Sequence, residues 1–167
     1  MILLSCATAA LVLAASAAAQ TLNPWPQYNY GRNGLATDGD VDTADIRELS
    51  PGKAADYFLL FNRGMSYSGF YIQSSGDYVI DYNVVAVSGT RGYLDVGRVC
   101  GARGNFTFVP FKDPESGGSV WSDTLFIEVT AARNNASTSV INEIWPVFPN
   151  DEIVDPKNTS PCPTYTR

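Results

Sequence analysis

Three aspartates alternate along the chain near residue 40, and a fourth follows them, a pattern with the chemistry of a metal-binding loop. Asp38, Asp40 and Asp42 are separated by single residues, and Asp45 comes three positions later. Alternating carboxylates are the hard oxygen ligands around which a loop wraps Ca²⁺. One interpretation of this segment is therefore a structural calcium site, which would be the only cofactor that the sequence implies.

This segment is also similar to the second half of a dockerin or EF-hand calcium loop, over about twelve residues. The match fails at the first two ligand positions, which hold Gly34 and Ala36, and the second copy that a dockerin needs is absent. The other interpretation is a solvated acidic turn, in which Thr43 or Asp42 caps a short helix over residues 43–49. In that case the chain has no cofactor.

The chain contains no histidine, and this excludes several kinds of catalysis. Ser-His-Asp and Cys-His nucleophiles, His-ligated zinc and the copper site of polysaccharide monooxygenases all need that side chain. A small glycosidase needs only two carboxylates, so it is the enzyme alternative to a protein without catalytic activity. The acids that could form such a pair are spread along the chain: Asp77, Asp81, Asp95, Asp113, Glu115, Asp123, Glu128, Glu143, Asp151 and Glu152.

Aromatic residues are numerous, with 3 Trp and 9 Tyr, more than a core of this size usually requires. Tyr and Trp can stack on the apolar face of a sugar ring while their polar ends stay in water. Tyr67 lies in a Gly/Ser-rich turn and Trp121 follows Gly117 and Gly118. Both are candidates for ligand binding, and the alternative for each is ordinary packing at the ends of the domain.

Residues 1–19 have the features of a secretory signal peptide, namely a short apolar run followed by an Ala-x-Ala motif. We expect cleavage after Ala19 and a secreted, extracellular protein. The whole net charge of −6 then belongs to the remaining residues. An acidic chain with scattered lysines has no electrostatic footprint for nucleic acid or for an anionic membrane surface, so we expect neither as a partner and no membrane insertion.

Two cysteines remain after the leader that contains Cys6 is removed, Cys100 and Cys162. Because an oxidising compartment favours the bridge, the sequence predicts a Cys100–Cys162 disulfide, with two free buried thiols as the alternative. Asn105, Asn135 and Asn158 each begin an Asn-x-Ser/Thr acceptor for N-glycosylation. These features are typical of a secreted glycoprotein.

Short apolar runs with turns between them predict a domain made of strands. In residues 77–87, Tyr78, Ile80, Tyr82, Val84 and Ala86 alternate with other residues and share one face. Further strands are expected at residues 57–61, 70–72, 93–96, 106–111, 120–121, 124–129 and 140–145. Seven or eight strands at intervals of about ten residues indicate an all-β fold, a two-sheet antiparallel β-sandwich or jelly roll.

This domain is expected to span residues 55–148. It follows an irregular N-terminal arm over residues 20–54, which holds the acidic turn and the short helix, and it precedes a Pro-rich C-terminal tail over residues 149–167.

The segment Ser75–Val96 resembles the signature of jelly-roll carbohydrate-binding modules, a Gly-x-Tyr-x-Ile-x-Tyr-x-Val strand followed by a small turn and a Leu-x-Val strand. Gly117–Trp121 and the later strands have a similar order and spacing, so the resemblance extends over residues 55–148. It implies a sugar ligand held by Tyr67, Trp121 and Asn142. Two features depart from the pattern: the Glu-rich first strand is not recognisable, and the Gly-Gly-Trp-x-x-Trp motif keeps a single Trp.

The resemblance implies a secreted, non-catalytic protein that recognises neutral extracellular or cell-wall glycans through loop aromatics. The same strand signature is similar to the trimeric jelly rolls of the tumour-necrosis-factor and complement type. A structural subunit of an extracellular coat or cell wall fits the composition equally well. These two readings stay open as alternatives, and the oligomeric state does not follow from the sequence.

Overall fold

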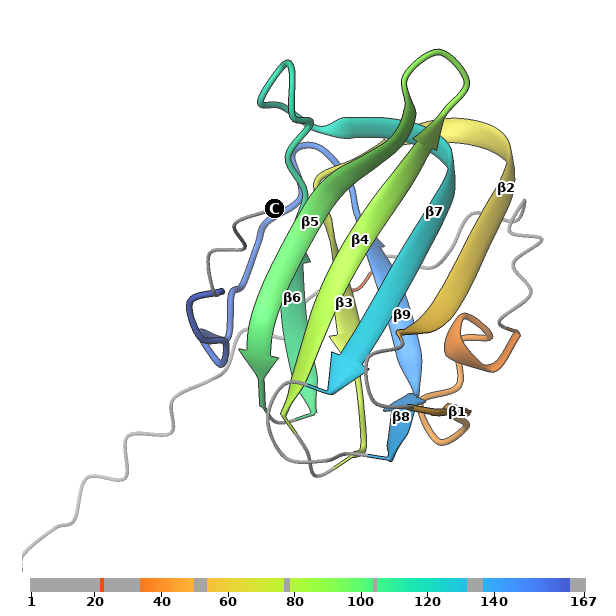
Figure 1. Cartoon of the computed structure of the whole chain (residues 1–167), viewed down its shortest axis with the longest axis vertical. Helices are drawn as coiled ribbons and strands as arrows, with labels where there is room; N and C mark the ends of the chain where they lie inside the picture. Colours follow the sequence, from red (N-terminus) through yellow and green to blue (C-terminus); the bar gives the residue numbers. More distant parts are fainter. Residues whose placement is uncertain are drawn as a thin grey trace, which may run out of the picture.

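The protein is a sandwich of two antiparallel sheets (Figure 1). Its computed structural model describes residues 22, 34–49, 54–76, 79–103, 105–131 and 137–162. One sheet has the strand order β2-β7-β4-β5, and the opposing sheet has the order β6-β3-β9. A third, two-stranded sheet pairs β1 with β8 at one end of the sandwich. The predicted all-β, two-sheet antiparallel fold is therefore confirmed.

The described elements begin with a short 3₁₀ helix, η1, at Gly34–Ala36. The strands follow in chain order: β1 Asp45–Glu48, β2 Ala55–Tyr67, β3 Gly69–Gln73, β4 Ile80–Ser88, β5 Gly92–Ala102, β6 Phe106–Pro110, β7 Val120–Ala131, β8 Thr138–Ile141 and β9 Glu143–Val147. None of the described residues belongs to a helix long and apolar enough to cross a membrane.

The core lies between the two large sheets and follows the predicted alternation. Ile80, Tyr82, Val84 and Ala86 of β4 are all buried. The same is true of the predicted inward residues of β7, Leu125, Ile127 and Val129. Alternate residues of a strand point to opposite faces, so the residues between them lie on the outer face of the sheet.

Residues 45–48 form strand β1, and the helix expected over residues 43–49 is wrong. Asp45 pairs with Ile141 and Glu48 with Thr138 in an antiparallel ladder with β8. Within β1, Arg47 forms a salt bridge of 2.9 Å with Asp45, two positions away. Residues two apart share a face in a strand but not in a helix, so this pair belongs to the extended conformation. The Arg47 guanidinium also lies 4.3 Å from the centroid of the Tyr57 ring.

Several strands are longer than the apolar runs that predicted them. β2 continues from the expected segment to Tyr67, with a register shift against β7 between Leu60 and Met65. The expected strand over residues 140–145 is divided into β8 and β9, which belong to different sheets. Asn142 lies between the two, where the chain passes from one sheet to the other.

The described part of the C-terminal tail, residues 149–162, belongs to no helix or strand but is attached to both large sheets. The Val154 N–H donates a hydrogen bond of 2.8 Å to the Tyr71 hydroxyl. Further along, Ser160 forms an isolated antiparallel bridge with Cys100, and the predicted Cys100–Cys162 disulfide follows directly. The tail thereby covers part of the edge of β5, a strand edge that would otherwise be exposed to other chains.

The outer face of the β6-β3-β9 sheet is covered as well. Tyr71, Phe108 and Val147 form a second buried cluster there, with Leu22, Phe106 and Trp145 packed against it.

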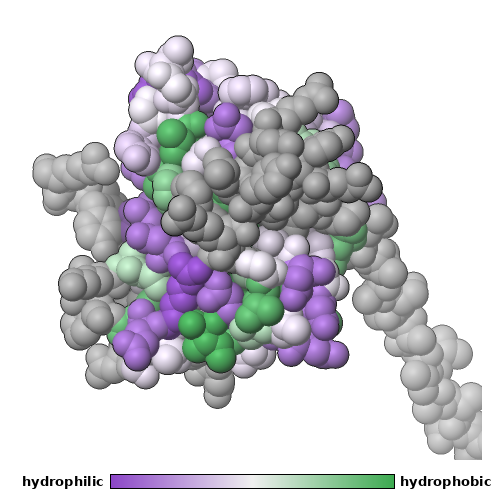
Figure 2. Space-filling model, turned by 90° about the vertical axis from the view of Figure 1, so that its right-hand side faces the viewer, coloured by the Kyte–Doolittle hydropathy of each residue, from purple (hydrophilic) through white to green (hydrophobic). Residues whose placement is uncertain are grey.

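The surface seen from the side of β2 mixes hydrophilic residues with small hydrophobic patches (Figure 2). Scattered apolar residues of this kind are usual on a protein surface.

Candidate functional site

Trp121 offers an exposed, flat aromatic surface near the start of β7. Its neighbours in the strand, Val120 and Ser122, point inward and are fully buried, whereas 63% of Trp121 is exposed. The indole lies over the backbone of β2 at Gly64, where any Cβ would overlap the six-membered ring of Trp121. Glycine at position 64 therefore lets one face of the indole rest on the strand, and the rest of the side chain stays accessible. We call this arrangement of Trp121 on Gly64 the Trp121 platform.

The loop that leads into β7 is held by the buried side chain of Asp113. This carboxylate accepts hydrogen bonds from the N–H groups of Glu115 and Ser116, at 3.0 and 2.9 Å. Arg91, in the turn between β4 and β5, pairs with Asp113 at 2.6 Å and with Glu115 at 3.1 Å. The hydrogen bond from Arg91 holds the pKa of Asp113 well below its usual range. The Arg91 pair thereby joins the β4–β5 turn to the loop over residues 112–119.

Tyr67 is a core residue and not part of the exposed surface. It is 0% exposed, and its ring stacks on Phe148 at a centroid distance of 5.9 Å. A second ring, that of Phe70, meets it edge-on at 6.1 Å. Burial, with a smaller contribution from Asp123, raises the pKa of the Tyr67 hydroxyl far above its ordinary value. The expected contact between Tyr67 and a ligand is not supported by this position.

Asn142 is also buried, and it connects segments of the fold. Its side-chain oxygen accepts a hydrogen bond of 2.7 Å from the N–H of Ser75. Its amide nitrogen donates to the carbonyls of Val41 and Thr43, at 3.2 and 3.1 Å. Because both ends of the amide are occupied by backbone groups, Asn142 holds the acidic turn against the end of β3. Of the three residues predicted to bind a sugar, only Trp121 is exposed.

The acidic turn is organised by its own side chains. Asp38 accepts hydrogen bonds from the Asp40 N–H and from the Thr43 hydroxyl, and Asp40 accepts one from the Asp42 N–H. Asp45 is directed to Arg47 in β1. In the part of the chain that the structure describes, no group of three or more His, Cys, Asp or Glu side chains is arranged to hold a metal ion. The calcium site predicted at Asp38, Asp40, Asp42 and Asp45 stays a prediction.

Glu143, one of the dispersed acids of the sequence, is a buried carboxylate beside this turn. It is 1% exposed and accepts hydrogen bonds from the Gly39 N–H at 2.7 Å and the Ile144 N–H at 3.2 Å. Burial, with smaller contributions from the nearby carboxylates of Asp38 and Asp40, raises the pKa of Glu143 to about 7 against the opposing effect of its two backbone hydrogen bonds. The group is therefore protonated in the folded protein at pH values where it is ionised in the unfolded chain.

We expect this difference to make the stability of the protein depend on pH. Since the folded pKa of Glu143 lies above the unfolded value near 4.5, its contribution is present below pH 4.5 and is lost as the pH rises to about 7. The loss should amount to at most about 3 kcal/mol of unfolding free energy. Urea unfolding between pH 4.5 and 8, in the presence of EDTA, measures it. Glu143→Gln removes the titrating group, so a variant with the same pH dependence as the wild type would contradict this assignment.

The glycosylation acceptors lie in different environments. Asn105 is exposed, Asn135 lies outside the described residues, and Asn158 is partly buried. The Asn158 amide nitrogen donates to the carbonyl of Phe106 at 2.7 Å and to that of Arg103. That nitrogen is the atom to which a glycan would be attached, so a glycan there and this docking of the tail exclude each other. Glycosylation of Asn105, Asn135 and Asn158 stays a prediction.

Sequence reasoning missed Tyr93, the most exposed of the large hydrophobic side chains that the structure describes, at 75%. It is the second residue of β5, next to the β4–β5 turn, and pairs with Val87. The available signal was its spacing from Asp95: two residues apart in one strand, they share a face, and the polar partner marks that face as solvent-exposed.

Comparisons with known proteins identify the fold. No protein-family model matches the chain, and no curated protein matches it by sequence. Solved structures do match, among them the family 32 carbohydrate-binding module of Clostridium perfringens NanJ, determined with galactose. That module is 16% identical, with a TM-score of 0.52, and the match covers 72% of this chain and 88% of the module.

Two further structures resemble the chain. A pectin-binding carbohydrate-binding module has 13% identity and a TM-score of 0.57, over 81% of this chain and 96% of its own. Chitosan-binding module 2 of a chitosanase/glucanase from Paenibacillus sp. IK-5 was determined with chitotriose. It has 14% identity and a TM-score of 0.53, and the match covers 69% of this chain and 85% of the module. The chain therefore has the β-sandwich fold of carbohydrate-binding modules.

Proposed function

We propose that this protein is a secreted, non-catalytic carbohydrate-binding protein and that it recognises neutral glycans through the Trp121 platform. The observation that carries the proposal is the indole that lies flat on Gly64 with 63% of the residue exposed. A rigid aromatic face offers the C–H groups of a pyranose ring a large contact area at little entropic cost. The net charge of −6 disfavours acidic polysaccharides by repulsion.

The shared fold supports the carbohydrate-binding part of this proposal. Modules with this architecture were determined with galactose and with chitotriose, and another is described as pectin-binding. A protein that only binds needs no carboxylate pair at a fixed separation, and the lack of histidine in the sequence is no obstacle to it. Binding is also consistent with the signal peptide that we predict for residues 1–19, because glycans of cell walls and surfaces lie outside the cell.

Replacing Trp121 by alanine is expected to weaken glycan binding about 5- to 30-fold, which corresponds to about 1 to 2 kcal/mol. Folding should be retained, since the side chain leaves a surface and not the core. A glycan array of neutral plant, fungal and algal polysaccharides, followed by isothermal titration with the strongest ligand, gives the measurement. Absence of binding by the wild type, or unchanged affinity in Trp121→Ala, would contradict the proposal.

Gly64→Ala provides a sharper version of the same test. The three atoms nearest to the added Cβ all belong to the Trp121 side chain, so the indole must move while every atom of it is kept. We expect Gly64→Ala to bind glycans more weakly than the wild type as well, because a sugar ring can stack only on an indole that lies flat on the strand. Gly89→Ala is the matched control, since its Cβ meets nothing within 4 Å. Equal binding by both glycine variants would show that the flat orientation does not matter.

A further inference from the structure

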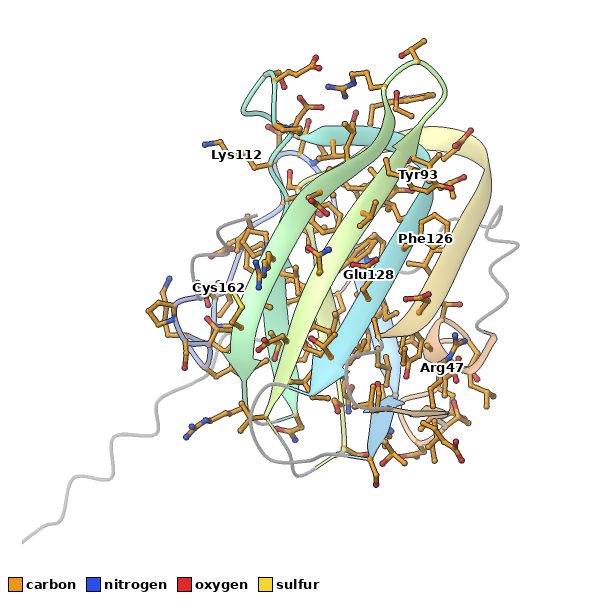
Figure 3. All side chains as sticks on the ribbon, viewed as in Figure 1. Arg47, Tyr93, Lys112, Phe126, Glu128 and Cys162 are labelled. Atoms are coloured by element: carbon orange, nitrogen blue, oxygen red, sulfur yellow. A yellow bond between two sulfur atoms is a disulfide. The ribbon has the colours of Figure 1, made fainter. Side chains whose placement is uncertain are left out.

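A groove of about 980 Å³ crosses the outer face of the four-stranded sheet, and the proposed function makes no use of it. Outward residues of β4, β5 and β7 form its floor, and Pro110, Lys112 and Pro114 form a wall where the chain leaves β6. The backbone bond from the Lys112 N–H to the Val96 carbonyl, 2.7 Å long, fixes this wall to β5. In Figure 3, Glu128 lies on the sheet between this wall and β2.

The floor of the groove carries a hydrogen-bonded cluster of polar side chains. Asn83 pairs in register with Glu128 on one side and with Arg98 on the other. The amide nitrogen of Asn83 donates to Glu128 Oε2 at 2.7 Å and contacts Asp95 Oδ1 at 3.3 Å. Asn83 thereby holds both carboxylates in place on this face. The cluster is therefore a fixed set of acceptors directed at the outer face, suited to the hydroxyl groups of a sugar.

An aromatic pair adjoins this cluster on the same face. Tyr93 precedes Asp95 by two positions in β5, and Phe126 precedes Glu128 by two positions in β7. Their rings approach to a centroid distance of 6.1 Å with the planes at 49°. Figure 3 shows Tyr93, Phe126 and Glu128 following one another down the sheet. Tyr93 is exposed and Phe126 is half-buried. An aromatic surface next to hydrogen-bond acceptors can hold the apolar and the polar sides of a pyranose at once.

We propose that the Tyr93–Phe126 pair and the groove form a second glycan-binding site, which takes an extended stretch of a neutral polysaccharide. The site runs along β4 from the level of Val87 to that of Asp81, about 20 Å at the rise of a strand. Such a length accommodates several sugar rings. Half of the lining residues are exposed, among them Lys112, Arg98 and Thr130, so the groove is open to solvent and a chain can lie along it. The lining of the groove has a net negative charge, because it holds three carboxylates and two cations: Asp81, Asp95 and Glu128 against Arg98 and Lys112. This charge repels a chain of uronic acids.

The experiment uses the Trp121→Ala protein, so that binding reports on the groove and not on the Trp121 platform. It is titrated with the linear hexasaccharides cellohexaose, mannohexaose and xylohexaose, and with hexagalacturonate for comparison. We expect at least one neutral hexasaccharide to bind, with an affinity at least tenfold higher than that of its disaccharide. Amide chemical shifts should change at residues 81–85 and 93–98 and not at residues 119–123.

Adding Tyr93→Ala to this background should lower the affinity about tenfold, and Glu128→Gln should lower it about fivefold. Ile46→Ala is the control, because Ile46 is an apolar residue with 64% exposure on β1, away from the groove. The inference is overturned if no neutral hexasaccharide binds to Trp121→Ala, if Tyr93→Ala binds as tightly as its parent, or if hexagalacturonate binds more tightly than the neutral chains.

These outcomes also separate the second site from the proposed function. If Tyr93→Ala alone leaves glycan binding intact and Trp121→Ala abolishes it, the Trp121 platform stands and the second site fails. If Trp121→Ala binds as well as the wild type and Tyr93→Ala abolishes binding, the second site stands and the platform fails.

Discussion

Replacing Cys100 and Cys162 together by alanine is expected to lower the free energy of unfolding by about 4 kcal/mol. The bridge joins residues separated by 62 positions, and in the chain-entropy model a loop of this size gives a stabilisation of that order. The melting temperature should fall by roughly 10 °C for a domain of this length. Thermal and urea unfolding of the wild type, oxidised and reduced, and of the double variant measure the effect.

The change should be confined to the tail in the folded state. Without the bridge, the described part of this segment is still held by the Ser160–Cys100 pairing, by hydrogen bonds of Asn158 with Arg103 and Phe106, and by the Val154 contact with Tyr71. Hydrogen exchange should therefore accelerate at residues 149–162 before it does in the central strands β4 and β7. Reduction of the wild type should reproduce the alanine variant. Two titratable thiols in the native, unreduced protein would contradict the bridge.

Replacing Tyr67 by alanine is expected to cost about 3 to 5 kcal/mol of unfolding free energy. The ring is fully buried between Phe148 and Phe70, so its removal leaves a cavity that the two sheets cannot close. A loss of this size approaches the whole stability of many domains. Circular dichroism and urea unfolding are the measurements, and the variant should form the native state poorly.

Tyr67→Phe is the matched control, because it keeps the ring and its contacts. It should keep most of the stability that Tyr67→Ala loses, and its glycan affinity should equal that of the wild type. Trp121→Ala should show the opposite behaviour, with little loss of stability and a clear loss of binding. A folded Tyr67→Ala protein that has lost only its affinity would show that Tyr67 reaches the ligand after all.

The contrast between these two aromatic residues shows where prediction from the sequence stopped. Tyr67 pairs with Val120, and its neighbour Ser66 pairs with Trp121, so both aromatics lie on one short stretch of ladder. Because successive side chains of a strand point to opposite faces, one enters the core and the other reaches solvent. The sequence placed both near turns and offered no way to distinguish their faces. Gly64, which makes the Trp121 platform possible, is far from Trp121 in the sequence.

The secondary structure of the acidic segment also could not be predicted from local sequence. Residues 43–49 have a local pattern that suits a short helix, yet residues 45–48 pair with β8, almost a hundred positions later. Hydrogen bonds to a distant strand outweigh the weak propensity of a few residues. Asn142 was likewise predicted to bind a ligand, but its side-chain amide forms hydrogen bonds with three backbone groups from two other segments.

The sequence by itself determined the all-β class, the two-sheet sandwich, the inward faces of β4 and β7 and the disulfide between Cys100 and Cys162. These follow from alternation and residue type, which are local properties of the chain. Only the tertiary structure decided that Asn83, Asp95 and Glu128 meet on one face, that Glu143 is buried beside the acidic turn, and that Trp121 lies on Gly64. The reason is physical: each of these contacts joins different strands, or a strand and a distant turn, and strand order and register are set by the packing of the whole core.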